Sequence, residues 1–295
     1  MKNSNLINLM CVCSLLISGS LPVSAGEEVR LTKAWTLTGF KQPESVVFDA
    51  KRSVLYISNV DGNPDDKDGK GGISRATLEG KMLQADWITG LNAPKGLAIS
   101  GDKLYATDID KLVEVDLATG KLVQKYAAPQ AKFLNDVTVD SAGHVYVSDM
   151  MDDTIYRLAD GRFEVWLKSA ALASPNGLYA EPGRIIEGAW GVMTDGFNTK
   201  VPGHLQAISL TDKTITALGK GQPIGNMDGV EGDGRGAYFV TDWMAGKLFH
   251  INAEGEATLL LDLGHGSADL TYIKDAQLLI VPMMSNNEII AFTVE

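Results

Sequence analysis

Four oxygen-bearing side chains recur at equivalent points of a sequence repeat and carry the candidate chemistry of this chain. They are Glu44, Asn135, Asn176 and Asp228. Two carboxylates and two amides suit a hard divalent cation such as Ca²⁺, which takes roughly six to eight oxygen ligands. Such a set would leave coordination positions for water and substrate. A single Asn or Asp more often caps a turn, but four of six equivalent positions favour a metal site.

The repeat consists of six three-residue tags that follow one another at intervals of 40 to 52 residues. In chain order the tags are Pro43-Glu44-Ser45, Pro94-Lys95-Gly96, Leu134-Asn135-Asp136, Pro175-Asn176-Gly177, Met227-Asp228-Gly229 and Ser267-Ala268-Asp269. An apolar or alternating run and then a β-rich run follow each tag. This period is typical of a β-propeller. We predict an all-β fold, a six-bladed propeller with four-stranded antiparallel blades, in which each tag opens the strand nearest the axis.

The last unit of the repeat is one strand short. Residues 288–294 supply only its third strand before the chain ends. Residues 34–37 are similar to the outer strands predicted at 86–89 and 165–167. We therefore predict that residues 30–38 pair outside the last blade, which closes the ring and removes an exposed sheet edge.

The first 25 residues are typical of a secretory signal, with Lys2 before an apolar stretch and small residues up to Ala25. We expect cleavage near Ala25, a periplasmic or secreted location, and a single propeller domain over residues 26–295. Cys11 and Cys13 both fall in the signal, so the remaining chain has neither a disulfide nor a catalytic thiol. Stability must then come from the core.

Composition argues against several classes of partner. The chain has a formal net charge of −11 and no basic cluster, which disfavours nucleic acid and anionic membrane surfaces. The signal stretch is too short and interrupted for a stable membrane span. No phosphate loop, zinc spacing or nucleophile elbow is present. The pattern leaves the oligomeric state open and favours a small-molecule partner.

Two long loops, at residues 59–72 and 190–204, should reach the same face of the disc as the tags. Long loops on a rigid scaffold often carry function. With the neighbouring loops they should bring a substrate-binding wall to the rim, formed by Met150, Trp190, Trp243 and His204. An apolar wall around a polar centre is the usual composition of a small-molecule pocket. Alternatively, these side chains only pack the loops together.

The tags containing Glu44, Asn135, Asn176 and Asp228 resemble those of the regucalcin–gluconolactonase family and, more distantly, diisopropylfluorophosphatase and the paraoxonases. The resemblance covers essentially the whole mature chain. It implies a six-bladed propeller that holds calcium, or another divalent ion such as Mg²⁺ or Mn²⁺, in the channel mouth. The family's metal glutamate, asparagine and aspartate fall on Glu44, Asn176 and Asp228, and Asn135 matches an asparagine that binds metal or substrate.

Two further features follow from the resemblance. Regucalcin-like proteins have a basic residue where this chain has Phe133, which weakens the case for a polyhydroxylated sugar lactone. Diisopropylfluorophosphatase-like proteins hold a structural calcium deeper in the channel, and Glu231 and Asp269 are the matching candidate donors for a second metal here.

These observations predict a hydrolase that depends on a divalent metal and acts on a lactone or related ester. The ion would polarise the carbonyl. Asp228 is the candidate general base or nucleophile. Lys95 would stabilise an oxyanion or anionic product, unless it is a surface lysine near the rim. The alternative function is a non-catalytic propeller that binds a ligand or a protein on its loop-rich face, because the fold alone does not determine function.

Overall fold

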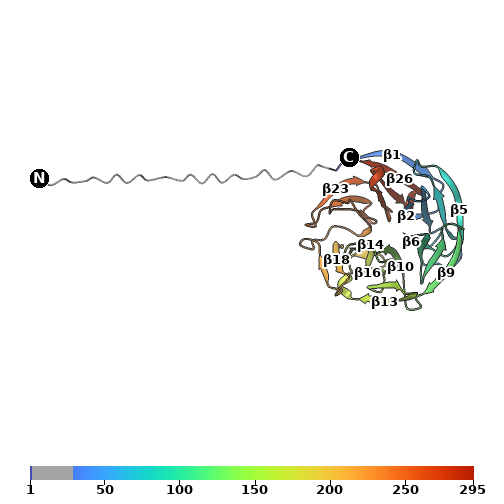
Figure 1. Ribbon diagram of the computed structural model, residues 1–295, viewed down its shortest axis with the longest axis horizontal. Coiled ribbons are helices and arrows are strands. Elements are labelled where there is room, and N and C mark those ends of the chain that lie inside the picture. Colours follow the sequence, from blue (N-terminus) through green and yellow to red (C-terminus); the bar gives the residue numbers. More distant parts are fainter. Residues whose placement is uncertain (2–28) are drawn as a thin grey trace.

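The computed structural model describes Met1 and residues 29–295. The predicted signal and its cleavage site near Ala25 lie, apart from Met1, outside the described residues. Six four-stranded antiparallel sheets surround a central axis (Figure 1). This arrangement confirms the predicted six-bladed propeller. Within the described part of the chain, no helix has the length and apolar character to cross a membrane.

In the first three blades the strands follow chain order from the axis to the rim. Blade 1 contains β2 (Pro43–Asp49), β3 (Val54–Asn59), β4 (Gly71–Ala76) and β5 (Met82–Leu91). Blade 2 contains β6 (Pro94–Ser100), β7 (Lys103–Asp108), β8 (Lys111–Asp116) and β9 (Lys121–Ala127). Blade 3 contains β10 (Leu134–Val139), β11 (Val145–Asp149), β12 (Thr154–Ala159) and β13 (Arg162–Lys168).

Blade 4 carries an extra hairpin, and blade 6 takes its outer strand from the other end of the chain. Blade 4 contains β14 (Pro175–Glu181), β15 (Arg184–Ala189), β18 (Leu205–Ser209) and β19 (Ile215–Ala217), with the hairpin β16 (Met193–Asp195) and β17 (Asn198–Thr199) inserted before β18. Blade 5 contains β20 (Met227–Gly232), β21 (Tyr238–Asp242), β22 (Lys247–Ile251) and β23 (Ala257–Asp262). Blade 6 contains β24 (Thr271–Ile273), β25 (Leu278–Met283), β26 (Glu288–Val294) and β1 (Leu31–Thr38).

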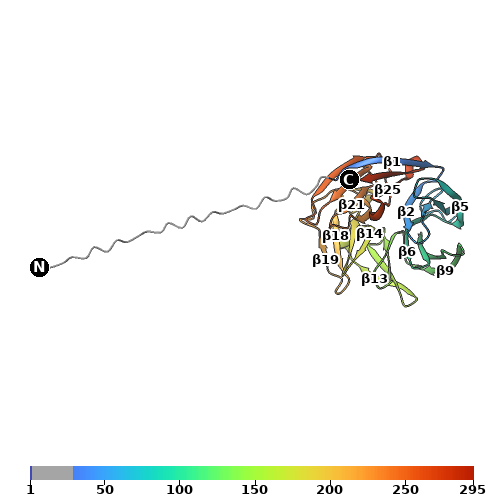
Figure 2. The ribbon, with the colours of Figure 1, turned by 45° about the horizontal axis from the view of Figure 1, so that its top comes forward.

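The ring closes through β1, as predicted. This strand pairs antiparallel with β26 from Leu31 opposite Val294 to Thr38 opposite Glu288. Arg30 and Glu295 continue the pairing through two backbone hydrogen bonds. In Figures 1 and 2 the blue β1 lies along the outer side of the red β26. Because β26 is paired with β25 on one side and with β1 on the other, its edge is not left exposed.

The sixth tag differs from its prediction, because it does not open a regular strand. Blade 6 has its inner strand only from Thr271, and Asp269 instead forms an isolated parallel bridge with Ser45 of blade 1. The Asp269 N–H donates to the carbonyl of Glu44 at 2.9 Å. The tag of blade 6 is therefore bound to the neighbouring blade, and this link helps to position Glu44.

Apolar side chains of adjacent blades form the core between them. One cluster joins Leu55 and Ile57 of blade 1 to Ile280 and Ile289 of blade 6, all four of them fully buried. β-branched and aromatic residues are favoured on such two-sided sheets. The core thus runs around the ring and leaves the axis open for polar side chains.

Candidate active site

Hydrogen bonds from the second strand of a blade hold the tags in place. The Ser58 and Ser148 hydroxyls each accept the N–H of the last residue in their blade's tag, at 2.9 Å. Asp108 accepts the N–H groups of Asn92 and Ala93, just before the second tag, at 2.9 and 3.0 Å. In blades 1, 2 and 3, polar residues at the end of the second strand therefore fix the segment that presents the tag.

Within each tag, the middle and last residues have different roles. The middle residues of the first five tags line a cavity at the mouth of the channel, whereas the last residues of the third and sixth tags, Asp136 and Asp269, line a second cavity. In the fourth tag, steric space restricts the last residue to glycine, because a Cβ on Gly177 would lie 1.9 Å from the carbonyl oxygen of Asp228. Glycine there lets blades 4 and 5 approach closely enough to bring Asn176 beside Asp228.

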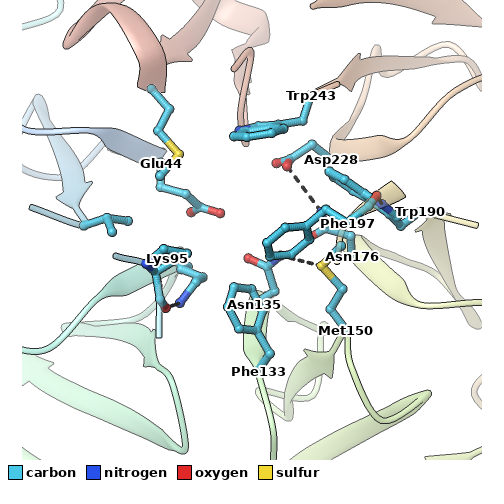
Figure 3. Close-up of a pocket in the computed structure, with 13 residues that line it drawn as sticks. Glu44, Lys95, Phe133, Asn135, Met150, Asn176, Trp190, Phe197, Asp228 and Trp243 are labelled. Carbon is cyan, nitrogen blue, oxygen red and sulfur yellow. Dashed lines mark hydrogen bonds between the residues drawn. The ribbon is translucent and has the colours of Figure 1, made fainter. Parts of the chain in front are cut away.

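The cavity at the mouth has a volume of about 80 Å³ and contains all four predicted oxygen ligands. Figure 3 shows the carboxyl groups of Glu44 and Asp228 and the amide of Asn135 pointing toward a shared space. The side chains of Asn135 and Asn176 each use an amide N–H, donating to the sulfur of Met150 at 3.4 Å and to Asp228 Oδ2 at 3.3 Å. Their amide oxygens are thereby turned away from these two partners.

Three buried oxygens in this cavity have no hydrogen-bond partner among the described residues. They are Glu44 Oε2, Asn135 Oδ1 and Asp228 Oδ1. Buried polar atoms are almost always hydrogen-bonded, so three such atoms from three blades around one cavity call for a further partner. Carboxylate and amide oxygens are the ligands that Ca²⁺ and Mg²⁺ prefer. The donor set therefore fits a divalent cation.

Carboxylates alone would not make this site. Among the described residues, no three His, Cys, Asp or Glu side chains are grouped closely enough to hold a metal ion. Any cation here would need the amides of Asn135 and Asn176 as well as the two carboxylates. The site therefore suits a cation through its combination of two carboxylates and two amides, and not through a cluster of acidic side chains.

Burial and like charges disfavour ionised carboxyl groups in this cavity. Burial raises the pKa of Glu44 well above its usual value, and Asp228 and Asp269 raise it further. Burial also raises the pKa of Asp228, with a second contribution from Asp269. A bound cation would reverse this balance, because an opposite charge favours the ionised form.

Lys95 lies in the cavity wall and is only 2% exposed, so it is not a surface lysine. Its ammonium donates to the carbonyl of Pro64 at 2.7 Å and to that of Ala93 at 3.1 Å. It also lies 4.2 Å from the centre of the Phe133 ring. Burial lowers the pKa of Lys95 to about 8, against the opposing effect of Glu44 and Asp108. Two of its three donors are thus used by the protein.

The rest of the wall is apolar and largely aromatic. The indole N–H of Trp190 donates to the carbonyl of Phe197 at 2.8 Å, which ties the β16–β17 hairpin to the cavity. Ring centres are 5.8 Å apart between Phe133 and Phe197, 6.0 Å between Trp190 and Phe197, and 6.1 Å between Trp190 and Trp243. Met150 completes the packing. The predicted wall residues Met150, Trp190 and Trp243 therefore all line the cavity.

His204 does not line the cavity, contrary to the prediction that it would bind substrate. Its ring lies beside Gly221, beyond the end of β19. From this insertion Phe197, in the hairpin, lines the cavity, whereas His204 lies after the hairpin and immediately before β18. Burial lowers the pKa of this histidine, as expected for a half-buried structural side chain.

Glu231 and Asp269 lie in a second cavity of about 210 Å³, formed by the innermost segments of all six blades. Burial raises the pKa of Glu231 to about 8 and that of Asp269 to about 7. Both carboxyls have a protein partner, the hydroxyls of Thr271 and Ser45 respectively. These two candidate donors for a second metal share one cavity, but they are not left without hydrogen bonds.

Three cavity residues were not singled out from the sequence, although each lies in a long loop that was predicted to reach this face. They are Val60, Pro64 and Phe197. Phe133 and Met284 also line the cavity. Phe133 stands two residues before Asn135, and this place in the repeat is what connected it with substrate selection in the sequence analysis. Phe197 has no such signal, because its position depends on how the blade-4 insertion folds.

The chain belongs to the SMP-30/gluconolactonase/LRE-like family, whose model matches residues 42–268. This result confirms the resemblance drawn from the tags. No curated protein sequence matches the chain significantly.

Solved structures share the fold at low sequence identity. A gluconolactonase from Xanthomonas campestris is 14% identical over 91% of each chain, with a TM-score of 0.66. A virginiamycin B lyase from Staphylococcus aureus is 15% identical over 90% of this chain and 99% of its own, with a TM-score of 0.60. A streptogramin B lyase is 13% identical over 90% and 98%, with a TM-score of 0.63. At these identities the similarity shows a common fold.

Proposed function

We propose that this protein is a divalent-metal-dependent hydrolase, most simply a calcium enzyme, that opens a lactone or related cyclic ester. One observation carries the proposal: Glu44, Asn135 and Asp228 each direct a buried, unpartnered oxygen to one cavity at the channel mouth. Membership of the gluconolactonase-containing family supports the reaction class. A bound divalent cation would supply Lewis-acid chemistry, the polarisation of a carbonyl oxygen.

The protein's own groups perform the remaining steps. Glu44 and Asp228 neutralise the charge of the ion, and Asn135 and Asn176 complete the set of oxygens. Asp228 takes a proton on its carboxylate from the attacking water and returns it to the ring oxygen when the acyl–oxygen bond breaks. The product is the open hydroxy acid. The third N–H of Lys95 is available to the developing oxyanion.

Calorimetric titration of calcium into chelator-stripped protein tests the proposal. We expect saturable binding that weakens at least about tenfold in Asp228→Asn, because an amide replaces one of only two charged ligands. Asp86→Asn, at an exposed position of β5, is the matched control and should bind as the parent does. Titrations with magnesium and manganese would identify the preferred ion.

A folded, stripped protein that binds no divalent ion would refute this function. The chain would then be treated as a non-catalytic propeller that binds a ligand or a protein through its loop-rich face. Undiminished binding by Asp228→Asn would also count against the site, even if calcium binds elsewhere.

A further inference from the structure

The cavity wall offers very few hydrogen bonds to a ligand. Apart from the four oxygen-bearing residues, its members are Val60, Pro64, Lys95, Phe133, Met150, Trp190, Phe197, Trp243 and Met284. The indole N–H of Trp190 already donates to Phe197, and two donors of Lys95 are taken by backbone carbonyls. Within the described wall, a ligand would find one remaining N–H on Lys95 and the indole of Trp243.

A polyhydroxylated lactone fits such a wall poorly. On binding, each ring hydroxyl would lose its hydrogen bonds to water and find no equivalent partner in the wall. A buried hydroxyl without a hydrogen-bond partner weakens binding. Alkyl and aryl groups carry no such penalty, and their burial against aromatic rings is favourable. The composition of the wall therefore discriminates between the two kinds of lactone.

The aromatic residues form one connected group over the mouth. Ring contacts lead from Phe133 on blade 3 through Phe197 and Trp190 on blade 4 to Trp243 on blade 5. Figure 3 shows Phe197 projecting between these side chains, above Asn176 in the view. Phe197 belongs to the hairpin that only blade 4 contains, and it is half-buried, so it can contact a ligand without forming part of the inter-blade core.

We propose that the substrate is a lactone bearing an apolar alkyl or aryl substituent and that Phe197 is the residue that selects for this substituent. The inference rests on the proposed hydrolase function and names the substrate class of the same site. The ester group lies toward Glu44 and Asp228, and the substituent packs against Phe197 and Trp190. The β16–β17 hairpin is then the specificity element of this propeller.

Two measurements test the proposal with calcium-loaded protein. The first compares kcat/KM for δ-lactones that carry a pentyl or phenyl group with kcat/KM for D-glucono-1,5-lactone. We expect a preference of about 100-fold for the apolar lactones, the order by which an apolar pocket rejects an added hydroxyl. Phe197→Gln should reduce this preference about tenfold. Phe163→Gln is the matched control, because Phe163 is half-buried on β13 and packs against Tyr126 and Tyr156 away from the cavity.

The second measurement is binding of the corresponding δ-lactams, which resist hydrolysis, followed by quenching of tryptophan fluorescence. Trp190 and Trp243 line the cavity and should report occupancy. We expect the phenyl lactam to bind at least about tenfold more tightly than the hydroxylated one, and Phe197→Gln to remove most of this difference.

The outcomes separate the substrate class from the reaction. Preference for D-glucono-1,5-lactone, or an unchanged preference in Phe197→Gln, would overturn the substrate inference while leaving the hydrolase intact. Tight, Phe197-dependent binding of the apolar lactam without hydrolysis of any lactone would support the ligand class and reject the hydrolase. If the apolar lactam does not bind, the inference is wrong whatever the activity.

Discussion

Lys95 holds a buried ammonium group between the blade-1 loop and the cavity. Its contacts with Pro64 and Ala93 leave one donor for substrate, and its pKa is lowered to about 8 by burial. The donor is present when the amine is protonated. At the residue scale, catalysis should therefore depend on both the presence and the protonation of this side chain.

Lys95→Met should lower kcat about 100-fold with a smaller change in KM, because an oxyanion donor acts mainly in the transition state. The activity of the parent should fall as the pH rises above about 8, and the variant should lack this alkaline limb. Steady-state kinetics from pH 6 to 10, corrected for spontaneous hydrolysis, provide the check. If Lys95→Met changes KM alone, the role of Lys95 is to hold the blade-1 loop through Pro64 and not to stabilise the transition state.

Glu187 is a fully buried carboxyl without a hydrogen-bond partner on either oxygen among the described residues. It lies opposite Leu178 in blade 4, where the corresponding pairs in blades 1, 3 and 5 place Ile57, Val147 and Val240. Burial raises its pKa well above the usual 4.5, with a contribution from Asp153. An acid therefore occupies a position that this fold otherwise fills with an aliphatic side chain.

Glu187→Val should raise the free energy of unfolding by about 1–3 kcal/mol at neutral pH, the order of an unsatisfied buried polar group. The folded state holds this proton more strongly than the unfolded state, so stability falls as the pH rises above about 4.5. The gain should consequently be larger at pH 7 than at pH 4.5. Urea unfolding at both pH values measures it, and a variant less stable at both would contradict the argument.

At the scale of elements, β1 completes a blade whose other strands lie at the opposite end of the chain. It pairs with β26 along its whole length, and Trp35 packs against the turn at Gly80 of blade 1. The strand thus completes the sheet of blade 6 and also contacts blade 1. Its removal would leave β26 as an open edge.

A chain that begins at Phe40 should be less stable than one that begins at Val29 by about 5 kcal/mol, equivalent to a fall in melting temperature of about 10–20 °C. Calorimetry of the two chains, together with their tendency to aggregate, gives the measurement. Equal melting temperatures would mean that pairing of β1 with β26 does not stabilise the propeller.

For the whole molecule, the channel mouth brings together carboxyl groups from different blades. Glu44 belongs to blade 1 and Asp228 to blade 5. Burial raises the pKa of both, and Asp269 of blade 6 raises it further. A cation at the mouth would favour the ionised forms and attract the two blades to one another.

Calcium at 100 times its dissociation constant should therefore stabilise the folded protein by about 2.7 kcal/mol and raise the melting temperature by about 5–10 °C. The chelator EDTA should reverse the shift, and Asp228→Asn should show little of it. Thermal unfolding at fixed ionic strength makes the comparison, because general salt screening must be held constant. A shift of the same size in Asp228→Asn would place the ion elsewhere.

Much of the architecture could be predicted because its determinants repeat along the chain. Blade number follows from the spacing of the tags, and polar residues at the end of a second strand bind the backbone within their own blade, as Ser58 does with Ser45. The third strand of blade 6, at Glu288–Val294, and the closing strand were both predicted for the same reason. His204 and the sixth tag were misjudged, since a hairpin and a neighbouring blade determine where they lie.

The sequence by itself determined the kind of residue that each blade presents at the axis, because alternation and turn chemistry act between residues close in the chain. Only the tertiary structure decided which of those residues are left without partners and what surrounds them. Lys95 meets Pro64 across 31 residues, and Ser45 meets Asp269 across 224. Phe197 reaches the mouth because a hairpin packs on Trp190. Such contacts depend on how whole blades approach one another, which no local pattern encodes.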